Sequence, residues 1–373
     1  MNLSDDSDPA RHYRRTMGLD RITLSQFRNH RATRLDGTAK FNLLIGENGA
    51  GKTNVLEALS LLAPGRGLRR AALPEIPAKD GTGGFAVSAD LADAVTLGTG
   101  VRPERPGRRV VQVNGAEVPA VRLGEWLSVG WLTPAMDRLF AEGAGARRRF
   151  LDRLVLALEP GHARNAARLE GALRERNRLL SDEHEPDPQW LDAIEMQLAE
   201  AGAEVAQARV RLITRLAEAL DALPDAPFAR PALAYQPGGP TDPAELTAEL
   251  AATRRRDRAA QRTLTGPHRD ELAVTMAGKD QPAADCSTGE QKAMLIAITL
   301  AHAGLLDPGR PGLLLLDEVA AHLDPLRREA LFDRLRGGPA QVWLTGTELA
   351  PFDAIADEAA VWRVSEGLAE RLA

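Results

Sequence analysis

Apolar and polar positions alternate in short runs over the first and last parts of the chain, and this period predicts β-strands. The runs bounded by turn residues are 19–27, 41–45, 85–91, 94–101 and 109–113, followed near the other end by 271–276, 313–316 and 341–345. Asn114-Gly115 is a turn signal that closes the first group. The runs at 41–45, 313–316 and 341–345 are mainly apolar, which favours buried strands.

The middle of the chain follows a helical period instead. Apolar residues recur every three or four positions from Phe150 to Leu158, over 166–180 and over 191–220. A polar break at 181–188 separates the last two segments and predicts an antiparallel helix pair. A proline-rich stretch at 224–243 ends the pair, and shorter helices are expected at 53–62 and 293–305.

These patterns predict an α/β protein assembled in an unusual order. Residues 19–130 and 280–373 would form one domain from both ends of the chain, and residues 131–279 would form an inserted, mainly helical lobe. Residues 1–18 are polar and charged, without the apolar core of a secretory signal, and we expect them to be a disordered tail.

Composition narrows the class of protein. With 44% hydrophobic and 27% charged residues the chain is typical of globular proteins. It has no run of about 18 apolar residues that could span a bilayer, so we expect no membrane partner. A single cysteine, Cys286, excludes a disulfide framework and favours a cytoplasmic location.

Charge leaves two interpretations open. The net charge of −5 argues against a uniformly basic nucleic-acid binder. Arginines nevertheless occur in clusters, which are equally typical of solvated helix faces and of surfaces that bind phosphates. The candidates for DNA contact are Arg66, Arg69, Arg70, Arg147, Arg148 and Arg149.

A phosphate-binding loop follows the strand at 41–45. Residues 46–53 fit the Walker A pattern G-x-x-x-x-G-K-[ST] without a mismatch, in the strand–loop–helix context that the pattern requires. Backbone N–H groups would surround the β-phosphate of ATP, Lys52 would reach the β- and γ-phosphates, and the Thr53 hydroxyl would bind Mg²⁺. The predicted nucleotide contacts in this segment are Gly46, Glu47, Asn48, Gly49, Ala50, Gly51, Lys52, Thr53 and Asn54.

The strand at 313–316 ends in two carboxylates, as a Walker B strand does. Asp317 would hold Mg²⁺, and Glu318 would be the catalytic base that polarises the attacking water. Glu318 and Lys52 are the predicted catalytic residues. A buried strand that meets a polar loop gives the same pattern, so the Walker A loop is what makes this interpretation strong.

A third element lies between the two. Ser287-Thr288-Gly289-Glu290 at a helix start resembles the signature of ABC ATPases, which contacts the nucleotide held by the opposite subunit. A hydroxyl, a glycine N–H and a helix N-terminus suit an anionic γ-phosphate, although serine and threonine also serve as ordinary helix caps. Ser287, Gly289 and Glu290 are therefore predicted to act on a partner's ATP, and Asp324 resembles the D-loop residue at the dimer seam.

The Walker A and Walker B motifs are separated by most of the length of the sequence, as in a short form of the SMC/Rad50 head. Beyond that, the chain resembles the RecF family of bacterial recombination mediators from about Leu19 to its end. The segments that carry the likeness are 27–29, 46–54, 147–152, 265–270 and 287–292, and Gly266-Pro267-His268-Arg269-Asp270 is the most distinctive of them.

This resemblance implies an ATP-dependent homodimer that binds duplex or gapped DNA, hydrolyses ATP slowly and in a DNA-dependent manner, and loads RecA together with RecR. It also implies that Arg28 contacts the nucleotide phosphates. The alternative is that Arg28 is only an exposed residue of a turn. Two departures concern γ-phosphate sensing: Thr345-Gly346-Thr347 replaces a switch histidine, and Ala135-Met136 replaces acidic residues after Pro134.

Two other hypotheses account for parts of the pattern. The ATPase subunit of a membrane transporter would share all three nucleotide motifs, but the long insertion and the missing switch histidine argue against it. A binding module with a structural ATP site is the other alternative, and the intact Glu318 argues against a complete loss of hydrolysis.

Overall fold

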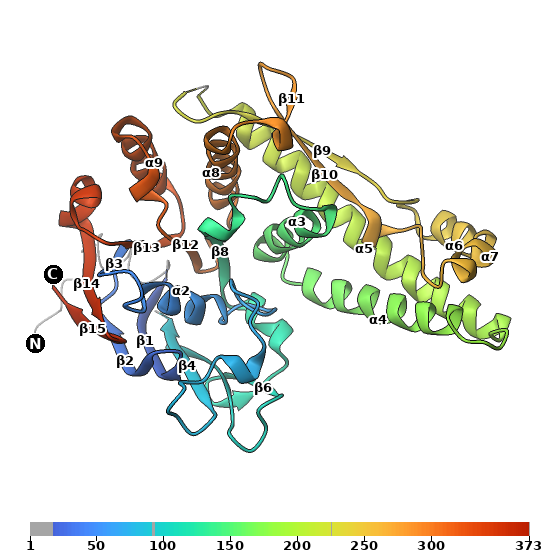
Figure 1. Cartoon of the computed structure of the whole chain (residues 1–373), viewed down its shortest axis with the longest axis horizontal. Helices are drawn as coiled ribbons and strands as arrows, with labels where there is room; N and C mark the ends of the chain where they lie inside the picture. The colour runs from blue at the N-terminus through green and yellow to red at the C-terminus, as the bar shows by residue number, and fades with distance from the viewer. Residues whose placement is uncertain (1–17, 92–93, 225, 373) are drawn as a thin grey trace, which may run out of the picture. The chain divides into compact units, whose positions relative to one another are not determined.

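The computed structural model describes residues 18–91, 94–224 and 226–372 (Figure 1). The predicted tail therefore lies outside the described residues, apart from Gly18. The chain divides into two compact units, which we call the first and the second unit. The first contains the residues up to 136, with 226–228 and 299 onward, and the second contains 137–225 and 229–298.

Two six-stranded sheets form the first unit. The antiparallel sheet has the order β2-β1-β4-β5-β6-β7, and the other has the order β15-β14-β3-β13-β12-β8 and is parallel except at β15. The first sheet comprises β1 (Leu19–Phe27), β2 (His30–Asp36), β4 (Phe85–Leu91), β5 (Val95–Val101), β6 (Arg109–Val113) and β7 (Ala116–Glu117). The second comprises β3 (Phe41–Ile45), β8 (Ser128–Leu132), β12 (Gly312–Leu316), β13 (Gln341–Gly346), β14 (Ala359–Ser365) and β15 (Leu368–Arg371).

The core of the first unit lies between these sheets. Strands β12 and β13 are buried along their whole length, as expected for parallel strands covered on both faces. Helix α2 (Lys52–Ser60) contacts β1 of one sheet and β8 and β13 of the other. Trp343 and Trp362 stack in this core with ring centroids 5.6 Å apart. The remaining helical segments of the unit are α9 (Pro325–Gly337), η1 (Leu73–Glu75), η2 (Ala120–Glu125), η3 (Pro134–Met136), η6 (Ala320–His322) and η7 (Ala350–Glu358).

The second unit is built on helices and a small sheet. Its helical segments are α3 (Ala144–Leu158), α4 (His162–Leu180), α5 (Pro188–Asp221), α6 (Pro243–Ala252), α7 (Arg254–Ala259), η4 (Pro267–Arg269) and η5 (Ala283–Asp285), with the start of α8 (Thr288–Gly304). Helices α4 and α5 lie side by side in Figure 1 and pack through an apolar core that includes Leu169, Leu198 and Leu250. No helix within the described ranges has both the length and the apolar composition that crossing a bilayer requires.

A three-stranded sheet contains the predicted strand at 271–276 and adds a strand within the proline-rich stretch at 224–243. Its strand order is β11 (Gln281–Pro282), β10 (Glu271–Met276) and β9 (Pro231–Gln236). The proline-rich composition at 224–243 hid β9, which is an edge strand with Pro231 at its first position, where no ladder N–H is needed.

The limits of the units differ from the predicted domain limits at three places, one of which is residues 226–228, which group with the first unit. Residues 131–136 group with the first unit because β8 pairs with β12, and residues 280–298 group with the second. The predicted signature residues therefore belong to the second unit and the Walker motifs to the first.

Buried arginines hold the second unit together. Arg209 on α5 donates to both carboxylate oxygens of Asp152 at 2.8 Å, to Asp270 at 2.6 Å and to the carbonyl of Pro267 at 2.7 Å. Asp270 also accepts from the Tyr235 hydroxyl. The distinctive segment 266–270 is thus an anchor for the long helix, because charge-assisted hydrogen bonds of this kind fix geometry.

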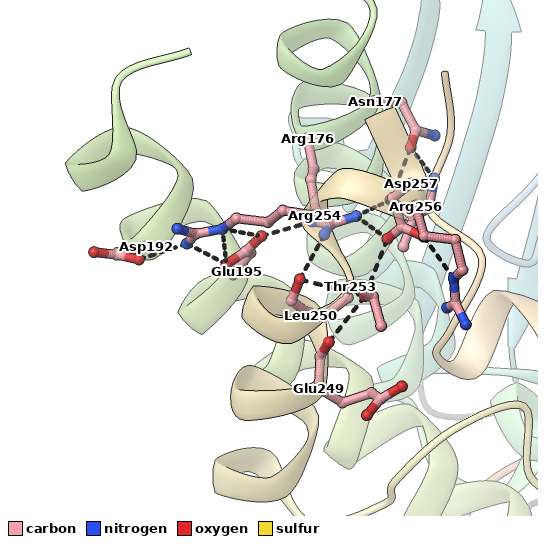
Figure 2. A network of polar contacts seen from close by, with 11 residues as sticks. Arg176, Asn177, Asp192, Glu195, Glu249, Leu250, Thr253, Arg254, Arg256 and Asp257 are labelled. Atoms are coloured by element: carbon pink, nitrogen blue, oxygen red, sulfur yellow. Dashed lines mark hydrogen bonds and ion pairs between the residues drawn. The ribbon is translucent and has the colours of Figure 1, made fainter. Parts of the chain in front are cut away.

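A second arginine network is shown in Figure 2. Arg176 is fully buried and donates to Glu195 at 3.0 Å, to Asp257 at 2.8 Å and to the Leu250 carbonyl at 2.9 Å. Arg254 also donates hydrogen bonds to the carboxylate of Glu195. The network ties α6 and α7 to the α4–α5 pair, and paired charges are the form in which ions are tolerated inside proteins.

The Arg209 anchor predicts a loss of stability in acid. Burial raises the pKa of Asp152, but hydrogen bonds from His162 and Arg209 outweigh it and lower that pKa to about 2. A folded-state pKa below the unfolded one stabilises the fold above about pH 4, and this contribution is lost as pH falls towards 2. Asp152→Asn should therefore lower the free energy of unfolding near pH 6 by about 2 kcal/mol and flatten the profile between pH 4 and 2.

Urea unfolding from pH 6 to 2 measures both effects. Asp221→Asn, at the exposed end of α5, is the matched control and should retain the parent profile. An Asp152→Asn profile parallel to that of the parent would contradict the role of this carboxylate.

Candidate nucleotide-binding site

The loop at 46–51 has a backbone that only glycine permits at several positions. A Cβ on Gly46 would lie 2.1 Å from the carbonyl oxygen of Val364, and one on Gly51 would lie 2.8 Å from the side chains of Asn29 and His30. Gly49 and Gly51 adopt φ values of 84° and 119°, in the left-handed region. The loop therefore curls tightly between β3 and α2, with backbone N–H groups available to an anion at the helix start.

Lys52 begins α2, and its side chain returns to the loop. The Nζ atom donates to the carbonyls of Gly46 at 2.6 Å and Glu47 at 2.8 Å, which leaves one of the three donors of an ammonium group for a phosphate. Burial lowers the pKa of Lys52, while the nearby charges of Glu318 and Asp317 act in the opposite direction. The Walker A lysine thus lies close to both Walker B carboxylates.

One polar network joins the two Walker motifs. The Thr53 hydroxyl lies 2.9 and 3.1 Å from the carboxylate oxygens of Asp317. Thr345 on β13 donates to Asp317 at 2.8 Å and accepts from the backbone N–H of Glu318 at 2.9 Å. Burial raises the pKa of Asp317, and the hydrogen bonds from Thr345 and Thr53 oppose that effect. The predicted metal-binding residues are therefore brought together, and Thr345 holds them.

This arrangement fits Mg²⁺. A hydroxyl and a carboxylate in contact are hard oxygen ligands, and Mg²⁺ is usually bound by one or two protein oxygens together with phosphates and water. In the described part of the chain, no group of three or more His, Cys, Asp or Glu side chains could hold a metal ion. The donor set of Thr53 and Asp317 thus suits a metal that arrives with a nucleotide.

Glu318 has an uncommon backbone. Its φ of 55° lies in the left-handed region, although glutamate has a Cβ that disfavours it. Such conformations cost about 1–3 kcal/mol and occur most often at functional sites. The bond from its N–H to Thr345 is one of the contacts that keep this turn in place.

Asn29, in the turn between β1 and β2, and His30, the first residue of β2, form a wall of the loop that sequence analysis missed. The Asn29 amide donates to the Ala50 carbonyl at 2.9 Å and accepts from Asn54 at 2.6 Å. His30 is fully buried, with Nε2 3.0 Å from the Gly51 carbonyl oxygen and Nδ1 2.9 Å from Thr33. Burial lowers the pKa of His30 and so favours the neutral ring. Its place next to Arg28-Asn29 was the available signal.

Glu57 is another residue that the sequence did not reveal. It is 2% exposed and forms a two-bond pair with Arg28, with distances of 2.9 and 2.6 Å, and it accepts from Arg69 at 2.9 Å. Arg69 also donates to Asn54. In this structure Arg28 and Arg69 are thus held at the rim of the loop by a buried carboxylate.

The predicted DNA contacts differ in their surroundings. Arg147 donates to both oxygens of Glu271 at 2.7 Å, and Arg148 donates to the Asp270 carbonyl at 2.8 Å, so both serve the second unit internally. Arg66, Arg70 and Arg149 are exposed. The arginine clusters therefore contain structural as well as surface members.

Three of the four predicted dimer-contact residues, Ser287, Glu290 and Asp324, are helix caps in this structure. Ser287 and Glu290 cap α8 reciprocally. Ser287 donates to the Glu290 carboxylate from its hydroxyl at 2.8 Å and from its N–H at 2.9 Å, and its hydroxyl oxygen accepts from the Glu290 N–H at 3.3 Å. A Cβ on Gly289 would meet nothing within 4 Å, so this face is open. Asp324 is exposed and caps α9 through the N–H of Arg327 at 2.9 Å. Capping does not conflict with contact to a partner's nucleotide.

Glu57→Gln should lower the stability of the fold around the phosphate-binding loop and weaken nucleotide binding. The change keeps the shape of the side chain but leaves two guanidinium groups without their buried anion, which should cost about 1–3 kcal/mol of unfolding free energy. Urea unfolding measures the loss, and titration with a fluorescent ATP analogue should show severalfold weaker binding.

Glu125→Gln is the control, because the pair between Glu125 and Arg122 is about half exposed and should contribute less than about 1 kcal/mol. Equal losses in the two variants would refute the role assigned to Glu57.

Comparison with known proteins identifies the family. Residues 18–348 match the family model described as the RecF/RecN/SMC N terminal domain. The chain is similar to the DNA replication and repair protein RecF of Mesorhizobium japonicum, with 46% identity over 366 residues that cover 94% of this chain and 96% of that protein.

Solved structures show the fold. A structure of the recombination mediator protein RecF with ATP in the RecFOR pathway has a TM-score of 0.82 and 24% identity, covering 96% of this chain and 98% of that one. An Smc head domain from Pyrococcus furiosus has a TM-score of 0.51 and 16% identity, covering 95% and 96%. The predicted class, an ABC/SMC-type ATPase head made from both ends of the chain, is confirmed, and the near full-length similarity shows that the chain belongs to the RecF family.

Proposed function

We propose that this chain is an ATP-switched DNA-binding protein of DNA repair and recombination. Two copies would close over two ATP molecules with Mg²⁺, hold DNA while closed, and separate after slow hydrolysis. The observation that carries the proposal is the network through which Thr53, Asp317, Thr345 and the Glu318 backbone join the two Walker motifs.

Each residue of the network has a role that fits its surroundings. Lys52 and the loop N–H groups would bind the phosphates, and Thr53 and Asp317 would hold Mg²⁺, which neutralises charge on the phosphates. Glu318 would orient and polarise the attacking water. Thr345 would keep Asp317 and Glu318 in register, so the missing switch histidine does not leave the Walker B end unsupported.

The opposite copy would complete the site. Ser287 and Gly289 would face the partner's γ-phosphate, since the open surface at Gly289 and the N-terminus of α8 suit an approaching anion. The exposed Asp324 would lie at the seam between the copies. Arg28 is held by Glu57, and from there it would contribute positive charge beside the phosphates.

DNA would be bound mainly through its phosphates, because exposed arginines such as Arg66 and Arg149 carry charge without a base-reading motif. The relatives are named DNA replication and repair proteins, and the family resemblance adds RecR as a partner and the loading of RecA as the task. Membership in the RecF family argues against the transporter alternative.

Glu318→Gln should trap the closed dimer. The amide keeps the size of the side chain but cannot act as a base, so turnover should fall by about 10²-fold or more while ATP binding remains. Light scattering should show a monomer that doubles in mass only with ATP and Mg²⁺ and then retains duplex DNA.

Two variants sharpen this experiment. Glu348→Gln changes an exposed glutamate beyond β13 and should hydrolyse ATP as fast as the unmodified chain. Ser287→Ala added to Glu318→Gln should bind ATP as a monomer. A mass that ignores ATP would refute the sandwich mechanism.

Arg66→Ala should reduce the salt dependence of DNA binding. Loss of one phosphate contact should lower the slope of log K against log salt concentration by about 1, equally for different DNA sequences. Fluorescence anisotropy from about 50 to about 200 mM salt would measure the slope, over a range in which phosphate contacts dominate the change in affinity. Arg122→Ala, an arginine already paired with Glu125, is the control and should leave the slope unchanged.

A further inference from the structure

The signature element of the second unit carries a negative charge where the proposed function needs a site for an anion. The Ser287 hydroxyl has one donor, and this donor is directed to Oε2 of Glu290 at 2.8 Å. Glu290 therefore lies beside the group that would meet the partner's γ-phosphate. A carboxylate at this position would repel a phosphate unless its charge were balanced.

A lysine from another segment balances that charge. Lys279 lies in the turn between β10 and β11, and its Nζ atom is 2.5 Å from Oε1 of Glu290. The two carboxylate oxygens are thus divided, one to Lys279 and one to Ser287. Lys279 and then Ser287 lower the pKa of Glu290 to about 2, so the carboxylate is ionised at neutral pH.

The turn and the signature are held in a fixed relation within the second unit. Gln281, next to the turn, donates from its side chain to the Asp285 carbonyl at 2.8 Å. Gln291 on α8 donates to the Cys286 carbonyl at 2.9 Å and is almost fully buried. Because both amides bind the backbone just before Ser287, Lys279 is presented to Glu290 by ordered segments.

The other charges in this region do not substitute for Lys279. Lys292 on the same helix is paired with Asp137 at 3.4 Å, and Asp285 adds a further exposed carboxylate before Ser287. Without Lys279 the stretch from Asp285 to Glu290 would present two carboxylates and no cation of its own.

We propose that Lys279 is a positioning residue of the composite ATP site, which acts through Glu290 by neutralising and orienting its carboxylate so that Ser287 and the start of α8 can receive the partner's γ-phosphate. This inference rests on the proposed function, since it concerns the contact that closes the dimer. Lys279 itself need not touch the nucleotide.

The test uses the full chain with Glu318→Gln as parent, so that ATP is not consumed. Lys279→Ala should weaken ATP-dependent dimerisation by about tenfold, the size of one ordinary charge contact. Binding of a fluorescent ATP analogue to the monomer should change by less than about twofold, because Lys52 and its loop are untouched. Lys279→Arg should restore dimerisation.

A double-variant cycle separates charge balance from simple support of the fold. In a chain with Glu290→Gln, the carboxylate charge is gone, so adding Lys279→Ala should have less than about twofold effect. Lys79→Ala removes an exposed lysine elsewhere and controls for overall charge. Thermal unfolding of each variant checks that the second unit is intact.

The outcomes are distinct. If the parent does not dimerise with ATP, the proposed function fails and not this inference alone. If the parent dimerises and Lys279→Ala does so equally well, the inference is overturned. It is also overturned if Lys279→Ala is as harmful in the chain that carries Glu290→Gln as in the chain that keeps Glu290. A defect seen only with the native Glu290 supports it.

Discussion

The nucleotide site depends on one buried carboxylate. Burying Asp317 disfavours its charge, and the hydroxyls of Thr345 and Thr53 offset that cost with hydrogen bonds. The sheet order explains why both are within reach. Strand β13 lies between β3 and β12, and the carboxyl ends of neighbouring parallel strands share one edge, where ligands bind in open α/β sheets. Three segments distant in sequence therefore meet at a single oxygen-rich point.

The order of strands in this sheet also explains how the chain accommodates a large insertion. Strands β3 and β12 must be near neighbours in one sheet, but the length of chain between them is almost free, since loop-closure entropy rises slowly with length. The second unit occupies much of this interval and has a core and buried ion pairs of its own. Helix α8 begins with Ser287 as its cap in that unit and is followed along the chain by β12, so the signature and Walker B are consecutive elements.

Sequence patterns predicted what depends on local chemistry. Apolar runs located strands such as β3, β10 and β12 within a residue or so, and the glycine spacing located the phosphate-binding loop. Glu57 and His30 were missed as site residues, and Thr345 was noted only within the segment that replaces a switch histidine. Each acquires its role from a partner distant in sequence or from burial that no local period encodes. Strand β9 was missed because proline is a breaker everywhere except at the positions an edge strand allows.

Arginine illustrates the limit of composition as a guide to function. A guanidinium has five donors in a planar fork and serves a buried carboxylate as readily as a phosphate. Arg69 is exposed but paired with the buried Glu57, and Arg147 is paired with Glu271, whereas Arg66 and Arg149 are exposed arginines outside these pairs. Arginines that are neighbours in sequence therefore differ in what they contact in the structure.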